Sequence, residues 1–96
     1  MGRYRLVIAP AAAETLRKVH PTLKRSIRNA LDALGDDPTI GEPLRGKLEG
    51  LWRYRVRRFR IVYAIDRSAR AVRVVAIGPR RSIYDDLTET RRSRVR

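Results

Sequence analysis

Arginine side chains in the second half of the chain have the type and spacing needed to bind phosphates. In the run WRYRV (52–56), arginine alternates with large apolar residues, which places Arg53 and Arg55 on one face of an expected strand. Arg60 begins the next apolar run and is expected across from these two. A guanidinium binds two phosphate oxygens at once, and an aromatic ring stacks on a base. The pattern predicts a site for a nucleic-acid backbone, formed by Arg53, Arg55, Arg60, Arg80 and Tyr84.

The basic charge of the chain is concentrated around these residues. The 96 residues include 23 Lys+Arg and 10 Asp+Glu, a net charge of +13, and residues 45–81 hold twelve basic residues against two acidic ones. The polar face of a half-buried sheet usually mixes both signs, because neighbouring like charges repel. The alternative is that this face of the sheet only contacts water. Because the segment contains so few acidic residues, contact with nucleic acid is favoured. Further backbone contacts are expected from Arg45, Lys47, Arg57, Arg58, Arg73 and Arg81.

The composition excludes several kinds of site. The chain has no cysteine, and therefore no disulfide, thiolate nucleophile or cysteine metal site; no metal and no cofactor is expected. The one histidine, His20, is expected to cap carbonyl groups at the end of a helix rather than to act in catalysis. The apolar stretch 6–13 is far shorter than the roughly 18 residues of a membrane span. No membrane partner is expected, and the protein is placed in the cytoplasm.

The first third of the chain predicts a strand and two helices. Residues 3–8 have the composition of a strand, and Pro10 fits the first turn of a helix, where a missing N–H costs nothing. Pro21 is expected to end that helix and Thr22 to cap the next one, which Gly35 ends. The second helix has the clearest apolar stripe, formed by Leu23, Ile27, Ala30, Leu31 and Leu34.

The sheet is expected after a loop rich in glycine and proline. Three apolar runs separated by short turns predict an antiparallel meander, with strands over 51–56, 60–65 and 71–77. These elements predict an α+β fold of order β-α-α-β-β-β, in which a helical hairpin packs on a small, mainly antiparallel twisted sheet. The length suits one domain, 1–96. Residues 85–96 are expected to form a short C-terminal helix or a mobile tail.

The sequence resembles a known family. The run LRGKLEGLWRYRVRRFRIVYAID (44–66), followed by VVAIGPRRSIY (74–84), is similar to the RelE/ParE superfamily of toxins from bacterial type II toxin–antitoxin systems. The order of the preceding elements agrees, so the resemblance covers nearly the whole chain. It implies a compact toxin domain and a cognate antitoxin encoded nearby. It also implies one of two activities, cleavage of ribosome-bound mRNA or inhibition of DNA gyrase.

On the RelE side, the resemblance implies attack of a ribose 2′-hydroxyl on the adjacent phosphate, without a metal. The family's catalytic residues fall on the five positions identified above. Arg53 and Arg55 are expected to hold the mRNA backbone. Arg60 and Arg80 are expected to stabilise the charge on the scissile phosphate, and Tyr84 to stack on a base or move a proton.

The chain departs from the family pattern at two places. Arg53 and Arg55 stand where some relatives have lysine, and arginine stays protonated at physiological pH. Removal of the 2′-hydroxyl proton therefore has no obvious agent unless Tyr84 or a ribosomal group serves. The pair Arg57-Arg58 replaces a turn that is often Gly-Asp, which removes a residue suited to positive φ and adds two charges.

Three functions are consistent with these residues. The first is a RelE-like endoribonuclease whose partners are an antitoxin, the ribosome and mRNA. The second is a ParE-like toxin that inhibits DNA gyrase without cleaving RNA. The third is a non-catalytic basic module that binds nucleic acid, with a steep salt dependence and no effect on growth. Retention of Arg60, Arg80 and Tyr84 favours the endoribonuclease.

Overall fold

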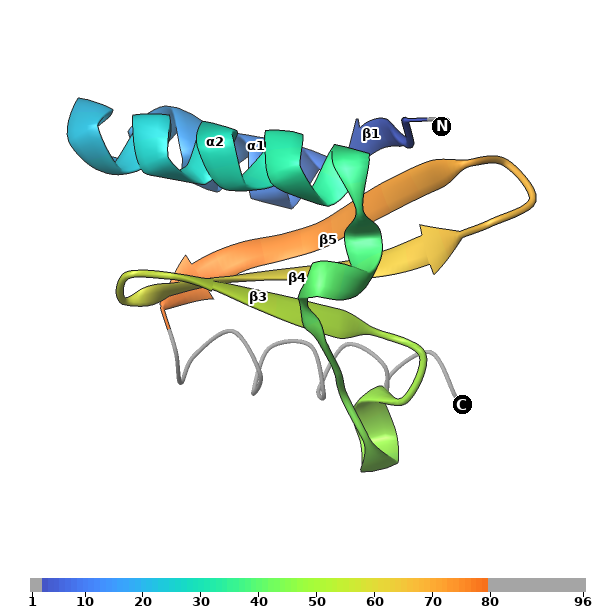
Figure 1. Cartoon of the computed structure of the whole chain (residues 1–96). Coiled ribbons are helices and arrows are strands. Elements are labelled where there is room, and N and C mark those ends of the chain that lie inside the picture. Colours follow the sequence, from blue (N-terminus) through green and yellow to red (C-terminus); the bar gives the residue numbers. More distant parts are fainter. Residues whose placement is uncertain (1–2, 80–96) are drawn as a thin grey trace.

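The computed structural model describes residues 3–79, in which two helices lie against one face of a five-stranded sheet (Figure 1). The helices are α1 (Pro10–Lys18) and α2 (Pro21–Asp36), and the short 3-10 helices are η1 (Pro38–Ile40) and η2 (Gly46–Leu48). The strands are β1 (Arg5–Ile8), β2 (Glu42–Pro43), β3 (Trp52–Val56), β4 (Phe59–Asp66) and β5 (Ala71–Pro79). The segment 85–96 and the predicted site residues Arg80, Arg81 and Tyr84 lie outside the described residues.

The sheet is mixed and has the strand order β1-β5-β4-β3-β2. Strand β1 runs parallel to β5, and the other neighbours pair antiparallel. This confirms the α+β fold and the meander that the sequence predicts. Strand β2 was not predicted, because two residues show no alternation and one of them is Pro43. Its position at the edge of the sheet suits a proline, which has no N–H to donate to a second neighbour.

Each of the two helices begins with a proline. Pro10 begins α1 as predicted, but Pro21 begins α2, so the prediction that Pro21 ends the first helix and Thr22 caps the second is wrong. Helix α1 already ends at Lys18. The Nδ1 atom of His20 accepts a hydrogen bond from the Thr22 N–H at 3.1 Å, so its predicted carbonyl-capping role is also wrong. A proline at the first helical position lacks only an N–H that would have no partner within the helix.

Helix α2 ends at Asp36, one residue beyond the predicted stop at Gly35. Gly35 is helical and buried, and its carbonyl oxygen accepts a hydrogen bond from the Tyr4 N–H at 2.8 Å. A Cβ atom on this residue would lie 3.3 Å from the Tyr4 carbonyl oxygen. Gly35 therefore allows the backbone before β1 to approach α2 closely, rather than ending the helix.

The main core lies between the helices and the sheet. The predicted apolar stripe of α2 faces this core: four of its five residues are buried, and Leu23 is half-buried. Strand β5 contributes both Val74 and Ile77, which are three residues apart. Both reach the same face because the pairing of β4 with β5 shifts between Val62 and Tyr63, as at a β-bulge. The buried residues are Ala12, Ile27, Ala30, Leu31, Leu34, Val56, Ile61, Tyr63, Val72, Val74 and Ile77.

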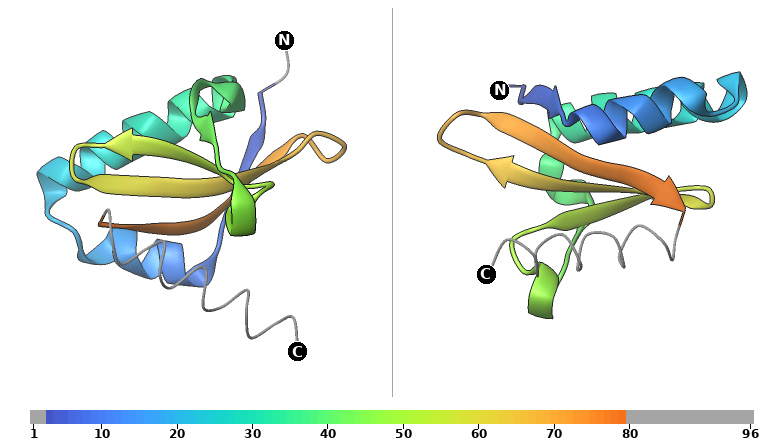
Figure 2. Two further views of the ribbon diagram at one scale, coloured as in Figure 1. Left: turned by 90° about the horizontal axis from the view of Figure 1, so that it is seen from below. Right: turned by 180° about the vertical axis from the view of Figure 1, so that it is seen from behind.

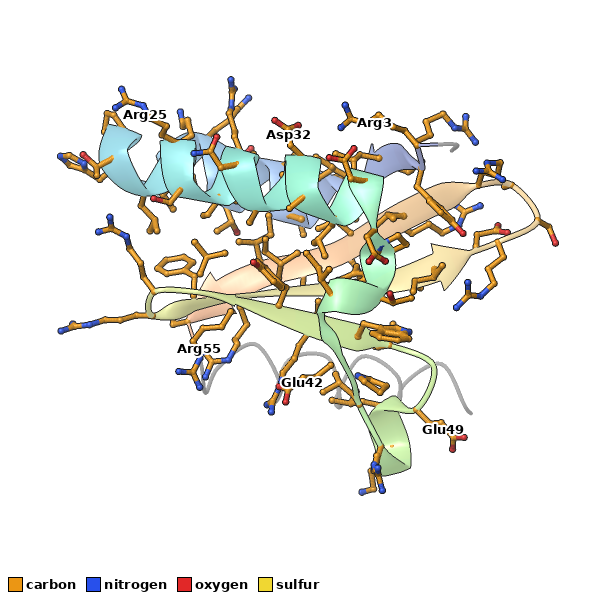
Figure 3. All side chains as sticks on the ribbon, in the orientation of Figure 1. Arg3, Arg25, Asp32, Glu42, Glu49 and Arg55 are labelled. Carbon is orange, nitrogen blue, oxygen red and sulfur yellow. The ribbon has the colours of Figure 1, made fainter. Side chains whose placement is uncertain are left out.

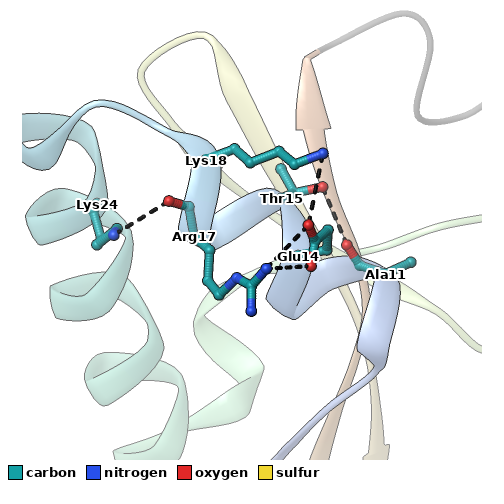
Figure 4. Close-up of polar contacts among 6 residues, drawn as sticks. All are labelled: Ala11, Glu14, Thr15, Arg17, Lys18 and Lys24. Carbon is teal, nitrogen blue, oxygen red and sulfur yellow. Dashed lines mark hydrogen bonds and ion pairs between the residues drawn. The ribbon is translucent and has the colours of Figure 1, made fainter.

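Polar contacts on the helical layer neutralise part of its basic charge (Figure 4). Glu14 forms ion pairs with Arg17 at 3.0 Å and with Lys18 at 3.6 Å. The Lys24 ammonium donates to the Arg17 carbonyl oxygen at 3.4 Å, which links the start of α2 to the end of α1. The cations near the end of α1 therefore have carboxylate partners.

Candidate active site

The pairing of β3 with β4 places three of the predicted arginines on one face of the sheet. Arg55 lies opposite Arg60 in the register, and Arg53 lies opposite Val62. Residues paired across two strands point to the same face, and so do residues two apart on one strand. Trp52, on the alternate set of β3, packs against the main core. The three arginines therefore share the face away from the helices, where Figure 3 shows the Arg55 side chain.

The three arginines differ strongly in exposure. Arg60 is 4% exposed and is the one buried charged residue among those described, whereas Arg55 is exposed and the Arg53 side chain is 39% exposed. Within residues 3–79, the Arg60 guanidinium has no carboxylate partner and donates one long hydrogen bond, 3.5 Å from Nη1 to the Phe59 carbonyl oxygen.

Within residues 3–79, only one long hydrogen bond offsets the cost of burying the Arg60 guanidinium. A buried cation loses its hydration, and a second guanidinium directly opposite on the neighbouring strand repels it. Both costs fall when an anion lies between the two groups. The geometry of Arg55 and Arg60 is therefore compatible with an anion between them.

A carboxylate that sequence reasoning missed lies beside the arginines. Strand β2 pairs Glu42 with Arg53, and Oε1 of Glu42 accepts from Nε of Arg53 at 3.0 Å. The Glu42 side chain is 71% exposed, so it is open to a substrate. A carboxylate can take a proton that an arginine cannot. The only signal in the sequence is an isolated acid before a proline, which does not reveal the pairing with a strand ten residues later.

The loop that carries Glu42 is held by Tyr63. The fully buried Tyr63 hydroxyl donates to the Pro38 carbonyl oxygen at 2.6 Å, and its ring stacks on Trp52 with centroids 6.3 Å apart. Burial raises the pKa of Tyr63 to about 12. A Cβ atom at Gly41 would lie 2.5 Å from the Arg53 carbonyl oxygen, so only glycine fits where the loop crosses β3. These contacts position β2 and hence Glu42.

The other predicted contact residues surround this face without forming one cluster. Arg45 and Lys47 lie at η2, and Arg57 and Arg58 form the β3–β4 turn at the other end of β3. Arg57 adopts positive φ (56°) although it is not glycine. Arg81 lies outside the described residues, like the catalytic candidates Arg80 and Tyr84.

Arg73 has a carboxylate partner of its own. It lies opposite Ala64 in the register and pairs with Asp66 at 3.5 Å. Hydrogen bonds from the Ala69 N–H and from Arg73 hold the pKa of Asp66 below its usual value. Because its charge is already partly compensated, Arg73 is a weaker candidate for phosphate contact than Arg55.

A second apolar cluster lies on this face beside the arginines. It is built around Leu51 and Val62, which are buried, and includes Leu44 and Leu48 from the loop between β2 and β3. An open hollow of about 530 Å³ is lined by residues 43–46 and 49–52, which include Arg45 and Trp52. The face therefore offers guanidiniums, the Glu42 carboxylate and apolar surface together, which suits a nucleotide's phosphate, ribose and base.

Two kinds of feature are absent from the described part of the chain. No group of three or more histidine, aspartate or glutamate side chains there could hold a metal ion. No helix between residues 3 and 79 is long and apolar enough to cross a membrane.

Comparison with known proteins adds family information. Residues 6–84 match the sequence model of the ParE toxin of type II toxin–antitoxin system, ParDE. The fold is similar to a chain of the RelBE2 toxin–antitoxin complex from Mycobacterium tuberculosis, with 26% identity and a TM-score of 0.77 over 83% of this chain and 94% of that one. The comparison with curated proteins finds no match.

Two further solved structures have the same fold. One is a chain of the intact RelBE toxin–antitoxin complex from Escherichia coli, with 22% identity and a TM-score of 0.70 over 80% of this chain and 96% of that one. The other is the YoeB/ParE toxin from Agrobacterium tumefaciens, with 20% identity and a TM-score of 0.71 over 79% of this chain and 98% of that one.

Proposed function

This chain belongs to the ParE toxin family of type II toxin–antitoxin systems, and from that premise we propose that it is a RelE-like endoribonuclease that cleaves ribosome-bound mRNA. The observation that carries the proposal is the arginine pair on β3 and β4. Arg60 is buried, lies opposite Arg55, and has no carboxylate partner within residues 3–79. Such an arrangement is favourable when a phosphate lies between the two guanidiniums.

The proposed reaction is an internal displacement at phosphorus. The ribose 2′-oxygen attacks the adjacent phosphate, the bond to the 5′-oxygen of the next nucleotide breaks, and a 2′,3′-cyclic phosphate and a free 5′-hydroxyl result. Negative charge develops on the non-bridging oxygens, where Arg55 and Arg60 donate. Preorganised donors of this kind contribute roughly 3 kcal/mol each to transition-state stabilisation. By resemblance, Arg80 supports the same charge and Tyr84 stacks on a base or moves a proton.

Glu42 is proposed as the base that accepts the 2′-hydroxyl proton. The Glu42 carboxylate lies on the strand next to Arg53, which holds it at 3.0 Å. It takes the proton as the 2′-oxygen attacks, and the leaving 5′-oxygen receives a proton from Tyr84 or from solvent. Arg53 then has two roles, to orient Glu42 and to bind the backbone of the mRNA. This assignment supplies the base that the replacement of lysine by arginine removes.

Primer extension on a defined mRNA tests the proposal. The purified protein is incubated with the mRNA in the presence and absence of programmed ribosomes. Cuts at the decoding site are expected only with ribosomes, and they should weaken at least about a hundredfold in Arg55→Ala, Arg80→Ala and Tyr84→Phe. The exposed turn residue Arg67 provides the control variant Arg67→Ala, which should cut normally.

Glu42→Gln isolates the proton acceptor. General-base catalysis contributes about 10²- to 10⁴-fold, so cleavage should fall by that factor while ribosome binding is retained. The control variant Glu49→Gln, at the end of the same loop, removes one negative charge as well and should cleave mRNA normally. Equal cleavage by Glu42→Gln and the wild type would remove Glu42 from the mechanism and leave the arginines in place.

Inhibition of DNA gyrase is the second candidate, and the match to the ParE toxin model favours it. Under this alternative, the protein blocks supercoiling by gyrase, produces no cuts in mRNA, and tolerates Arg80→Ala. A supercoiling assay run beside primer extension separates the two activities. A protein with neither activity and no effect on growth would be the basic binding module.

A cognate antitoxin is the proposed partner in either case. Several structural neighbours are toxin–antitoxin complexes. At a net charge of +13, the free chain would bind nucleic acid without selectivity, so an acidic partner in the cytoplasm would be needed to cover its basic surface.

A further inference from the structure

The open hollow of about 530 Å³ at the loop between β2 and β3 lies next to the proposed proton acceptor. Figures 1 and 2 show this loop, which contains η2, projecting from the sheet on the side opposite the two helices. In the β2–β3 register, Pro43 lies opposite Trp52, and both residues line the hollow. The next pair along the strands is Glu42 with Arg53. The hollow therefore begins one residue, about 3.3 Å along the strand, from Glu42.

The walls of the hollow are held in place by contacts within the protein. The Leu44 N–H donates to the Leu51 carbonyl oxygen at 2.8 Å and closes the loop, and the Leu51 N–H donates to the Leu48 carbonyl oxygen at 3.1 Å. The side chains of these three leucines pack in the second apolar cluster. The Trp52 ring stacks on Tyr63 and packs against the main core. The hollow is thus preorganised, and its volume lies in the range of roughly 300–1,000 Å³ that is typical of small-ligand sites.

One cation lines the hollow, and its charge is not compensated. Arg45 is exposed, and within residues 3–79 its guanidinium forms no ion pair or hydrogen bond. The acidic residue of the lining, Glu49, does not pair with it. The hollow therefore combines the donors of a planar guanidinium with the surfaces of an indole ring and of leucine side chains. These groups suit a nucleobase, which stacks by its face and accepts hydrogen bonds at its edge.

The donors of Arg45 discriminate among the four bases. Guanine presents two adjacent acceptors, O6 and N7, and an arginine donates to both. Adenine has an amino donor beside N7, cytosine also presents an amino donor, and uracil presents the single acceptor O4. An amino donor cannot accept from a guanidinium, which has donors only. The hollow is therefore most complementary to guanine.

We propose that this hollow binds a guanine base of the substrate RNA, which stacks on Trp52 and accepts from Arg45 at O6 and N7. The base belongs to a nucleotide next to the scissile phosphate, because the hollow adjoins Glu42. The inference rests on the endoribonuclease proposed above and adds a base preference to it. Arg45, which the sequence predicts as a backbone contact, becomes a specificity-determining residue.

The fluorescence of Trp52, the one tryptophan of the chain, tests the proposal. The probes are short 2′-O-methyl oligoribonucleotides, which lack the attacking hydroxyl. One contains only adenosine and the other has a single central guanosine, and each is titrated into the full-length protein. The guanosine probe should quench Trp52 and bind about tenfold more tightly than the adenosine probe. Inosine keeps O6 and N7 but lacks the 2-amino group, so it should preserve the preference, whereas 7-deazaguanosine should lose it.

Two matched variants separate base recognition from charge. Arg45→Lys keeps the charge but loses the planar fork of donors, so the preference for guanosine should fall below about twofold while the adenosine probe still binds. Arg67→Lys makes the same exchange in the β4–β5 turn and should keep the full preference. Thermal unfolding verifies that both variants are folded.

Three results would overturn the proposal: an unchanged preference in Arg45→Lys, a preference lost with inosine, or binding of the guanosine probe without quenching of Trp52. If the wild type binds neither probe at low salt, the RNA-directed function proposed above is wrong and this inference falls with it. If the wild type cleaves ribosome-bound mRNA but binds both probes equally, the endoribonuclease stands and only the base preference is wrong.

Discussion

The guanidinium of Arg60 lies buried opposite Arg55, where a structural role would favour an apolar side chain. Replacing a buried ionic group by a hydrophobic one of similar volume is often neutral or stabilises a protein by about 1–4 kcal/mol. Under the proposed function, Arg60 lowers stability and completes an anion site, as residues selected for binding or catalysis often do.

Arg60→Met should therefore separate stability from activity. We expect the free energy of unfolding to rise by about 1–3 kcal/mol, because a desolvated charge and its repulsion from Arg55 are removed. We expect mRNA cleavage to be lost in the same variant. Urea unfolding and primer extension measure the two quantities. A less stable Arg60→Met protein would mean that the guanidinium has a structural partner and would weaken the case for an anion site.

The buried hydroxyl of Tyr63 makes the stability of the folded state depend on pH in the alkaline range. Its pKa is raised by burial to about 12 from the 10.0 of an exposed tyrosine. The folded state therefore favours the neutral phenol. This contribution to stability is complete below about pH 10 and is lost as the pH rises through about 12.

Tyr63→Phe should remove this pH dependence. The variant loses the hydrogen bond to the Pro38 carbonyl oxygen, which leaves that oxygen unpaired and costs about 1–3 kcal/mol at neutral pH. Between pH 10 and 12, its stability should fall less steeply than that of the wild type. Denaturant unfolding at several pH values compares the two slopes. Parallel curves would show that Tyr63 ionises no later in the folded state than in the unfolded chain.

At the scale of elements, the short strand β2 positions the one carboxylate of the proposed site. It contains two residues, and its attachment to β3 depends on the close crossing at Gly41 as well as on two paired residues. A two-residue edge strand has little stability of its own, so the surrounding packing must hold it.

Gly41→Ala should loosen this attachment. The added Cβ would lie 2.5 Å from the Arg53 carbonyl oxygen, so either the loop or β3 must move. Overpacking of this kind typically costs about 1–3 kcal/mol. We expect a lower melting temperature and, under the proposed mechanism, reduced cleavage because Glu42 moves away from Arg53. Gly46→Ala on the same loop has open space around the added atom, although its positive φ adds backbone strain. Cleavage that survives in Gly41→Ala would argue against Glu42 as the base.

At the scale of the whole molecule, the net charge of +13 makes nucleic-acid binding dependent on salt. Each phosphate neutralised on a single strand contributes about −0.7 to the slope of log affinity against log salt. Residues that contact phosphate can thus be distinguished from residues whose charge is compensated within the protein.

The structure predicts different slopes for two arginines on the same face. Arg55→Ala should reduce the magnitude of the slope by about 0.7, because an exposed guanidinium without a carboxylate partner in the described residues is removed. Arg73→Ala should change it less, because Asp66 already pairs with Arg73. Fluorescence anisotropy with a short labelled RNA at several salt concentrations measures both. Equal slopes for the two variants would mean that the ion pair opens on binding.

Local patterns account for the parts of the fold that the sequence predicted. The alternation of WRYRV separates core residues from Arg53 and Arg55, and the stripe of α2 identifies the face that packs on the sheet. The predictions for the helix ends were wrong where the local sequence is compatible with two structures. Pro21 follows one helix and begins another, and His20 lies between them, so the sequence around them is compatible with either capping role.

Side-chain periodicity and charge are local properties, and they are sufficient to predict the two helices, the meander, the faces of its strands and the concentration of arginine. Three features become visible only in the folded chain: Glu42 pairs with Arg53, Arg60 is buried opposite Arg55, and Arg57 and Arg58 border an apolar cleft with α2. These contacts join segments that are distant in the chain or separated by turns of unpredicted geometry. They form because the core orders the whole sheet at once, and no short stretch of sequence encodes that pairing.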